Sequence, residues 1–158
     1  SPEDRKVISA ADKKSEATDG QPAVAIELPD GTIVTGKTSN LLGASSAALL
    51  NAVKTVAGLP DDLLMIAPSI IEPIQKLKIA ILKNHNPRLH SDETLIALSM
   101  SANTNPVAKK ALEAIGMLAG CEAHSTVILS QVDQDVYRKL GINLTCEPRY
   151  QTKKLYHK

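Results

Sequence analysis

The sequence predicts a layered α/β/α fold built around a mixed sheet of about five strands. Two observations predict it. Short β-branched segments alternate with longer segments whose apolar residues recur at helical spacing, and the first two β-branched segments flank a hairpin turn. A hairpin followed by αβ units gives a mixed sheet with helices on both faces. The composition agrees, because 43% of the 158 residues are apolar and 22% are charged, which is typical of one soluble globular domain.

The boundaries of this domain follow from composition along the chain. Residues 1–22 are polar and charged and offer only Val7, Ile8 and scattered alanines for burial, so we expect a linker or a short N-terminal helix there. The single α/β domain is predicted to span residues 23–150. Residues 151–158 are basic, and we expect them to form a loosely held tail.

A hairpin opens the predicted domain. Residues 29–31 form a Pro-Asp-Gly turn sequence between two strand-forming runs, 23–28 and 32–36. Leucines, valines and alanines then recur at helical spacing. Gly58 followed by Pro60 is a stop signal that ends this first helix.

One short strand and three helices are predicted for the middle of the chain. The brief apolar run 63–68 predicts the strand, and apolar residues at helical spacing predict a helix over 70–81. A second helix is expected over 91–101, where the macrodipole favours the two acidic residues of the first turn. The third runs over 105–120, because an asparagine cap precedes a proline at the first helical position.

A strand over 125–130, a helix over 130–141 and a strand over 142–148 end the predicted domain. The helix opens with the capping sequence Ser130-x-x-Asp133. The complete order is therefore β-β-α-β-α-α-α-β-α-β. The same order occurs in the cytidine-deaminase-like fold, which the chain resembles, although a shared topology does not transfer a function.

A match to the nucleotide phosphate loop is present in the sequence and is rejected. Residues 31–38 satisfy the pattern G-x-x-x-x-G-K-[ST] letter for letter. A true phosphate loop follows a strand and curls its backbone N–H groups around a phosphate. Here the four intervening residues are themselves strand-forming, and Gly31 already belongs to the hairpin turn.

An anion site is predicted just after the hairpin. Lys37 and three hydroxyl side chains, Thr38, Ser39 and Ser45, lie between a strand end and the start of a helix. Exposed N–H groups and the positive end of the helix dipole suit a phosphate or a carboxylate at such a place. The alternative is that Ser45 merely caps the helix and Lys37 is solvated.

An acid–base pair is predicted near the fourth strand. Glu122 and His124 are two residues apart, so in an extended segment they point to the same side and could exchange protons with one substrate. The alternative is a loop in which both side chains bond only to backbone groups.

No metal site is predicted from residue spacing. Deaminases of this topology use H-x-E or C-x-E at one helix start and P-C-x-x-C at the next. The corresponding segments, 43–45 and 68–72, contain no such ligands. The remaining candidates are scattered without C-x-x-C or H-x-x-x-H spacing: Cys121, Cys146, His90 and His124.

Several segments carry a resemblance to a known family, namely ELPDGTIVTGKTSNLLGASSAALLNAVK, NPRLHSDETLIALS, GCEAHSTVILSQVD and KLGINLTCEP. Over about residues 4 to 150 the chain resembles the C-terminal region of the bacterial domain-of-unknown-function family eighteen-forty-six. The resemblance implies a larger protein whose N-terminal region has its own glycine-rich, phosphate-loop-like stretch. It also implies a deaminase-like fold. No established reaction comes with the family, so no catalytic residue is carried over.

Two functions remain open. The first is part of an enzyme active site that takes a phosphorylated small molecule or nucleotide, with its cofactor unknown. The second is a non-catalytic module that packs against the N-terminal region or forms a homo-oligomer through the alanine- and leucine-rich helices of segments 45–57 and 94–119.

Composition excludes other partners and suggests a compartment. Eighteen basic side chains balance seventeen acidic ones, and the chain has no Trp or Phe and only three Tyr, so we do not expect nucleic-acid binding. No apolar run approaches the roughly 20 residues that span a bilayer. Two cysteines are too few for a disulfide framework, which favours the cytoplasm.

Overall fold

The sheet has two central strands, each with one edge strand beside it. In the computed structural model, which describes residues 5–148, four strands are arranged in the order β2-β1-β3-β4. Strand β1 is antiparallel to β2 and to β3, whereas β3 and β4 are parallel, so the sheet is mixed. The strands are β1 (Ala23–Glu27), β2 (Ile33–Lys37), β3 (Glu122–Ser125) and β4 (Asn143–Cys146).

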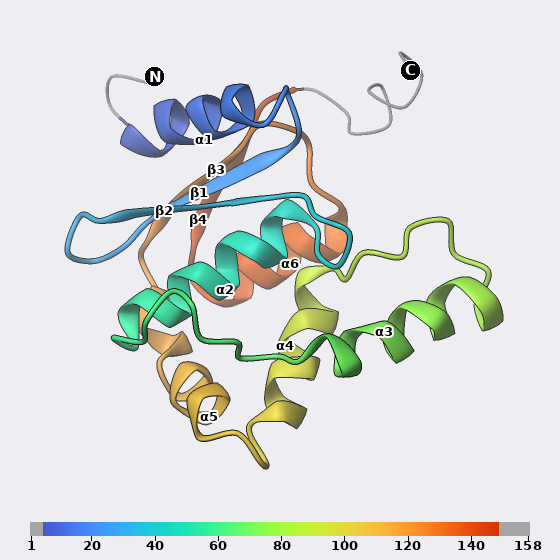
Figure 1. Ribbon diagram of the computed structural model, residues 1–158. Coiled ribbons are helices and arrows are strands. Elements are labelled where there is room, and N and C mark those ends of the chain that lie inside the picture. Colours follow the sequence, from blue (N-terminus) through green and yellow to red (C-terminus); the bar gives the residue numbers. More distant parts are fainter. Residues whose placement is uncertain (1–4, 149–158) are drawn as a thin grey trace.

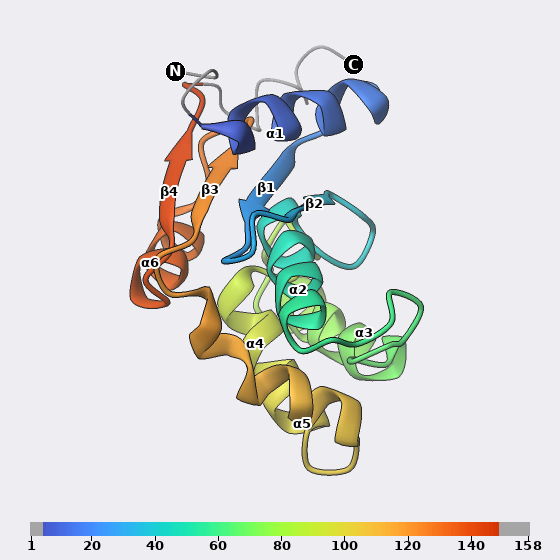
Figure 2. The ribbon, with the colours of Figure 1, turned by 90° about the vertical axis from the view of Figure 1, so that its left-hand side faces the viewer.

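Helices cover both faces of this sheet. Helix α1 packs on β1, β2 and β3 from one side, while α2 packs on β1 and β2 and α6 packs on β4 from the other (Figures 1 and 2). The α-helices are α1 (Lys6–Ala17), α2 (Ala44–Val56), α3 (Pro68–Lys76), α4 (Ser91–Ser101), α5 (Pro106–Glu113) and α6 (Gln131–Lys139). None of the helices within residues 5–148 is long and apolar enough to cross a membrane.

The core is divided by the sheet into a large and a small part. The large part lies on the α2 side and includes Val24 and Ile26 of β1, whereas Ala25 belongs to a small cluster under α1 with Val7 and Ala11. This division follows from the strand period, since successive residues point to opposite faces. The α1 face is therefore thinly packed and leaves room there for polar side chains.

The predicted α/β class, the hairpin and a helix over 91–101 are confirmed, but the sheet has four strands rather than five. The predicted strand 63–68 is a loop. Its apolar side chains were the reason for the prediction, and Met65 and Ile66 are indeed buried in the core without pairing to any strand.

The predicted strand over 125–130 is displaced, because β3 ends at Ser125. The Ser125 hydroxyl accepts from the Val127 N–H and donates to the Val127 carbonyl, and both bonds are within the buried interior. A local side chain–backbone turn of this kind competes with the hydrogen bonds of a ladder. The chain therefore leaves the sheet five residues before α6 begins.

Two predicted helices are interrupted. The helix over 70–81 consists of α3 and a π-helical turn, η1 (Leu77–Ile81), and Pro73 lies inside α3, where it lacks the N–H that an α-helix needs. The helix over 105–120 consists of α5 and a 3₁₀ turn, η2 (Ile115–Leu118). The predicted tail at 151–158 and the boundary at residue 150 lie outside the described residues.

Candidate functional site

A pocket of about 360 Å³ lies where three helices begin. Helix α2 contributes residues 43–45, and α6 contributes Asp133 together with its N-cap, Ser130. The loop that leads into α4 contributes Arg88 and His90. These segments are far apart in the sequence, and the fold brings them together on the α2 side of the sheet (Figure 1).

The start of α2 offers unused hydrogen-bond donors to this pocket. Its N-cap is Gly43, which has no side chain to cap the helix. Within residues 5–148, the first-turn N–H groups of Ala44, Ser45 and Ser46 donate to no protein acceptor. The residue Ser45 is 1% exposed and lines the pocket. Free amides at the positive end of a helix dipole favour an anion.

The other two helix starts already have acceptors. The Asp133 carboxylate of α6 accepts from the N–H and the hydroxyl of Ser91 in α4, at 2.8 and 2.6 Å. The Ser130 hydroxyl in turn accepts from the Asp133 N–H at 3.2 Å. Of the three helices that meet at the pocket, α2 is the one whose N-cap residue has no side chain.

Tyr137 ties α6 to α2 from behind the pocket. Its hydroxyl is fully buried and donates to the Ser45 carbonyl at 2.7 Å. Burial, with the nearby Asp133 carboxylate, raises the pKa of Tyr137 well above its ordinary value, so the phenol remains a proton donor. This bond links the second half of α6 to the start of α2.

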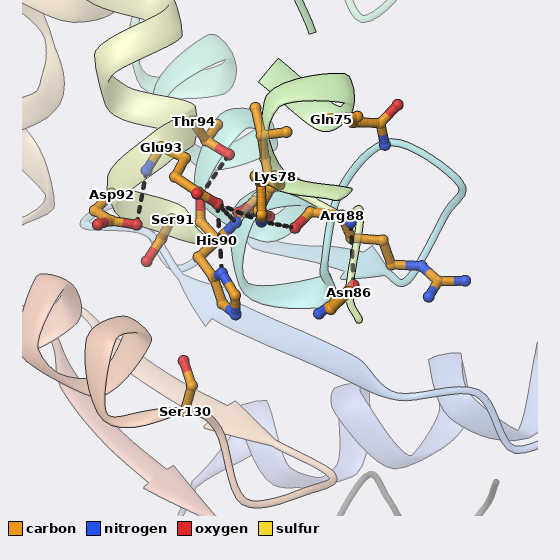
Figure 3. Close-up of polar contacts among 12 residues, drawn as sticks. Gln75, Lys78, Asn86, Arg88, His90, Ser91, Asp92, Glu93, Thr94 and Ser130 are labelled. Atoms are coloured by element: carbon orange, nitrogen blue, oxygen red, sulfur yellow. Dashed lines mark hydrogen bonds and ion pairs between the residues drawn. The ribbon is translucent and has the colours of Figure 1, made fainter. Parts of the chain in front are cut away.

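A buried ionic network holds the loop before α4 (Figure 3). Lys78 of η1 is 3% exposed and donates to the Arg88 carbonyl at 2.6 Å and to Glu93 Oε1 at 2.7 Å. The same carboxylate oxygen accepts from the His90 backbone N–H at 2.9 Å and lies 3.4 Å from His90 Nδ1. The network fixes His90 at the pocket and gives its ring a carboxylate neighbour, an arrangement suited to proton transfer.

Electrostatics keep this carboxylate charged. Burial raises the pKa of Glu93, but the bond from Lys78 and the His90 N–H outweigh it, and the net pKa is lowered. A charged Glu93 is the partner that a buried ammonium requires.

Of the four predicted anion-binding residues, the structure brings only Ser45 to the pocket. Lys37 is exposed at the end of β2, and Thr38 donates its N–H to the Pro22 carbonyl. The Ser39 hydroxyl accepts from the amides of residues 41 and 42, and its carbonyl accepts from Arg88 Nε. The predicted segment thus touches the pocket wall through Arg88 rather than lining the pocket itself.

The predicted acid–base residues lie on the opposite, α1 face of the sheet. Glu122 and His124 share one face of β3, since His124 is paired with Ala25 of the α1 cluster. Glu122 pairs with Arg5 at 3.0 Å and accepts from Asn143 at 2.8 Å. His124 bonds to other partners, and within residues 5–148 no hydrogen bond joins it to Glu122.

Sequence reasoning missed Arg88, His90 and Asp133 as pocket residues. The signal that could have found the first two is the run of ionisable residues over 88–93 before a helix. That run is also what helix capping produces, as Glu93 does here, so it is ambiguous without the fold.

Comparison with known proteins places the chain in a family. Residues 3–156 match the model described as "Domain of unknown function DUF1846, C-terminal". A UPF0371 protein of Corynebacterium urealyticum is 53% identical over 158 residues, and one of Streptococcus thermophilus is 54% identical over 157. The alignments cover 100% and 99% of this chain but only 32% of either relative, so the chain spans about a third of their length.

Proposed function

We propose that this chain, which belongs to the C-terminal DUF1846 family, binds a phosphate-bearing small molecule at the start of α2. The observation that carries the proposal is the group of three first-turn amides without acceptors, which belong to Ala44 and Ser45 at the pocket wall and to Ser46, which follows them. Phosphate oxygens accept several N–H donors at once, which is why helix starts recur in phosphate sites.

The size and walls of the pocket support a small ligand. A volume of about 360 Å³ is at the lower end of ligand pockets, which span roughly 300–1,000 Å³. Arg88 supplies a fixed positive charge on the same wall, and His90 supplies a titratable ring. Asp133 is the one carboxylate among the lining residues, and it is already bonded to Ser91.

In an enzyme built on this site, His90 is the lining residue that we propose as the proton-transfer group. The predicted pair Glu122 and His124 lies across the sheet, so one substrate cannot reach both locations within this chain. Their role as acid and base is a separate proposal that requires a second pocket on the α1 face. The family membership names no reaction, and the remaining two-thirds of the relatives is available to complete the site.

We also propose that the sheet is of the deaminase-like class. The support is its strand order β2-β1-β3-β4, which begins with the hairpin expected for that class. A crystal structure superposed on deaminase sheets tests this assignment, and a mismatch of strand directions would refute it.

The site is tested by giving α2 the cap that it lacks. Gly43 has ordinary dihedral angles, and a Cβ built there meets only the Leu89 carbonyl, at 3.8 Å. Gly43→Asp should therefore fit, place a carboxylate on the free amides and compete with the ligand. We expect it to raise the melting temperature slightly and to abolish stabilisation by phosphate compounds in a thermal-shift assay.

The controls separate this site from its alternatives. Gly43→Ala adds a Cβ without a charge and should keep the ligand response. A ligand at 100 times its Kd adds about 2.7 kcal/mol to the free energy of unfolding, so the wild-type response is easily measured. Loss of the response in Lys37→Ala, with its retention in Gly43→Asp, would instead support the site predicted from the sequence.

The alternative function, an interaction module, is favoured by one apolar surface. The end of the arm formed by α3 and η1 exposes Ile81 and Leu82 at 69% and 58%, and Figure 1 shows this arm projecting from the body. We propose that the remainder of the longer family proteins covers it. Light scattering should then show a monomer for this chain, whereas a dimer disrupted by Ile81→Lys would make a second copy the partner.

A further inference from the structure

A group of three possible metal ligands lies on the α1 face, away from the α2 pocket. Asp12 of α1, His124 of β3 and Glu147, which follows β4, each offer one donor atom. These donor atoms all lie within 4.8 Å of one another. Two carboxylates from other parts of the chain thus lie close to the buried His124 of β3.

The histidine is held in a fixed orientation. His124 is 4% exposed, its Nδ1 lies 2.7 Å from the Thr145 hydroxyl, and its Nε2 lies 3.1 Å from Glu147 Oε2. The hydroxyl on Nδ1 orients the ring so that Nε2 faces the carboxylates. Ligating histidines characteristically have a second residue bonded to the other ring nitrogen, which fixes the tautomer.

Arg5 lies close to this group and bonds to the strands beside it. The Arg5 guanidinium pairs with Glu122 and donates to the carbonyls of Ala123 and Asn143 and to the Thr145 hydroxyl. It therefore supports Thr145, the residue that orients His124.

We propose that Asp12, His124 and Glu147 bind a divalent transition-metal ion of the Zn²⁺ type. One imidazole and two carboxylates suit Zn²⁺, and three protein ligands leave a position for water. Ligand atoms about 2.0–2.1 Å from a tetrahedral ion lie about 3.3 Å apart, close to the 3.1 Å between Nε2 and Oε2. The ion would tie α1 to the sheet.

This assignment differs from both sequence predictions for the region. The spacing of histidines and cysteines along the sequence predicted no metal site. These three ligands come from distant parts of the chain, so no local spacing reveals them. A His124 that coordinates an ion through Nε2 cannot also carry the proton of an acid–base pair with Glu122. The same experiment therefore decides between the two roles of His124.

The test is metal binding by the purified, chelator-treated chain. We expect titration calorimetry to give one Zn²⁺ per chain, and Co²⁺ to give the visible absorption of a low-coordinate site. Asp12→Asn keeps the size of a partly exposed side chain and should weaken Zn²⁺ binding at least about tenfold. His124→Gln should do the same, and circular dichroism checks that both variants fold.

Matched controls exclude adventitious binding. Glu16→Gln removes an exposed carboxylate from the same helix and should bind Zn²⁺ like the wild type, as should Cys146→Ser. The proposal is overturned by equal affinity in Asp12→Asn and wild type, by loss confined to Cys146→Ser, or by a wild-type Kd weaker than about 100 µM. The phosphate response of α2 should be unchanged in Asp12→Asn, so the two proposals fail independently.

Discussion

At the scale of single residues, Glu93 holds together the ionic network beside the pocket. One of its oxygens accepts from both the Lys78 ammonium and the His90 backbone N–H. Lysine is almost never fully buried without a partner, because the charge loses its hydration. Glu93 therefore makes the burial of Lys78 possible, and Lys78 in turn holds the Arg88 carbonyl.

We predict that Glu93→Gln lowers the free energy of unfolding by about 2 kcal/mol at pH 7, because it leaves a buried ammonium without its counter-charge. The value is below that for a fully buried pair, since the Glu93 side chain is 27% exposed. Urea denaturation measures it. The control Glu72→Gln, on an exposed position of α3, should change stability by less than about 0.5 kcal/mol.

The pair of Glu93 and Lys78 makes the free energy of unfolding depend on pH, and the direction follows from the Glu93 pKa. The pKa of Glu93 is lowered in the folded protein from its ordinary value of 4.5. Its contribution is thus complete above pH 4.5 and is lost as the pH falls through the folded pKa. The stability difference between wild type and Glu93→Gln should shrink in acid. A difference that stays constant from neutral pH to pH 3 contradicts this account.

At the scale of elements, the sequence predicted the hairpin and helix α4 correctly, because turn and capping residues determine both locally. The Pro-Asp-Gly turn fixed the hairpin, and the acidic first turn marked α4. The strand predicted over 63–68 was wrong. Met65 and Ile66 are buried because their side chains are apolar, and burial does not require hydrogen bonds to a neighbouring strand. The period of two places Glu122 and His124 on one face. Their partners Arg5 and Glu147 come from other elements, which no local pattern reveals.

Strand β2 and helix α2 pack closely at Gly36. A Cβ on Gly36 would lie 2.1 Å from the Ala48 backbone nitrogen, so the strand and the helix touch backbone to backbone. We predict that Gly36→Ala costs about 1–3 kcal/mol of stability through overpacking.

Calorimetric melting compares this variant with Gly116→Ala, where nothing lies within 4 Å of the added Cβ. The control should melt close to the wild type. Equal melting temperatures for all three proteins would show that α2 can move away from β2 at no cost.

At the scale of the whole molecule, the pocket exists only because of the topology. Residues 43–45, 88–90 and 130–133 each begin or precede a helix, and they meet after the chain has crossed the core. For this reason the sequence indicated Ser45 but could not indicate which other segments face it. The sheet then separates this pocket from the Asp12, His124 and Glu147 group, so one chain presents two independent locations for charged ligands.

The most direct test of the anion site is the ¹⁵N–¹H spectrum of the protein during titration with inorganic phosphate and then with a nucleotide. A bound anion shifts the amides that donate to it. We predict saturable shifts for Ala44, Ser45 and Ser46, and none for these amides in Gly43→Asp. Shifts confined to residues 37–39, or no saturable shift at any amide, would contradict the proposed site.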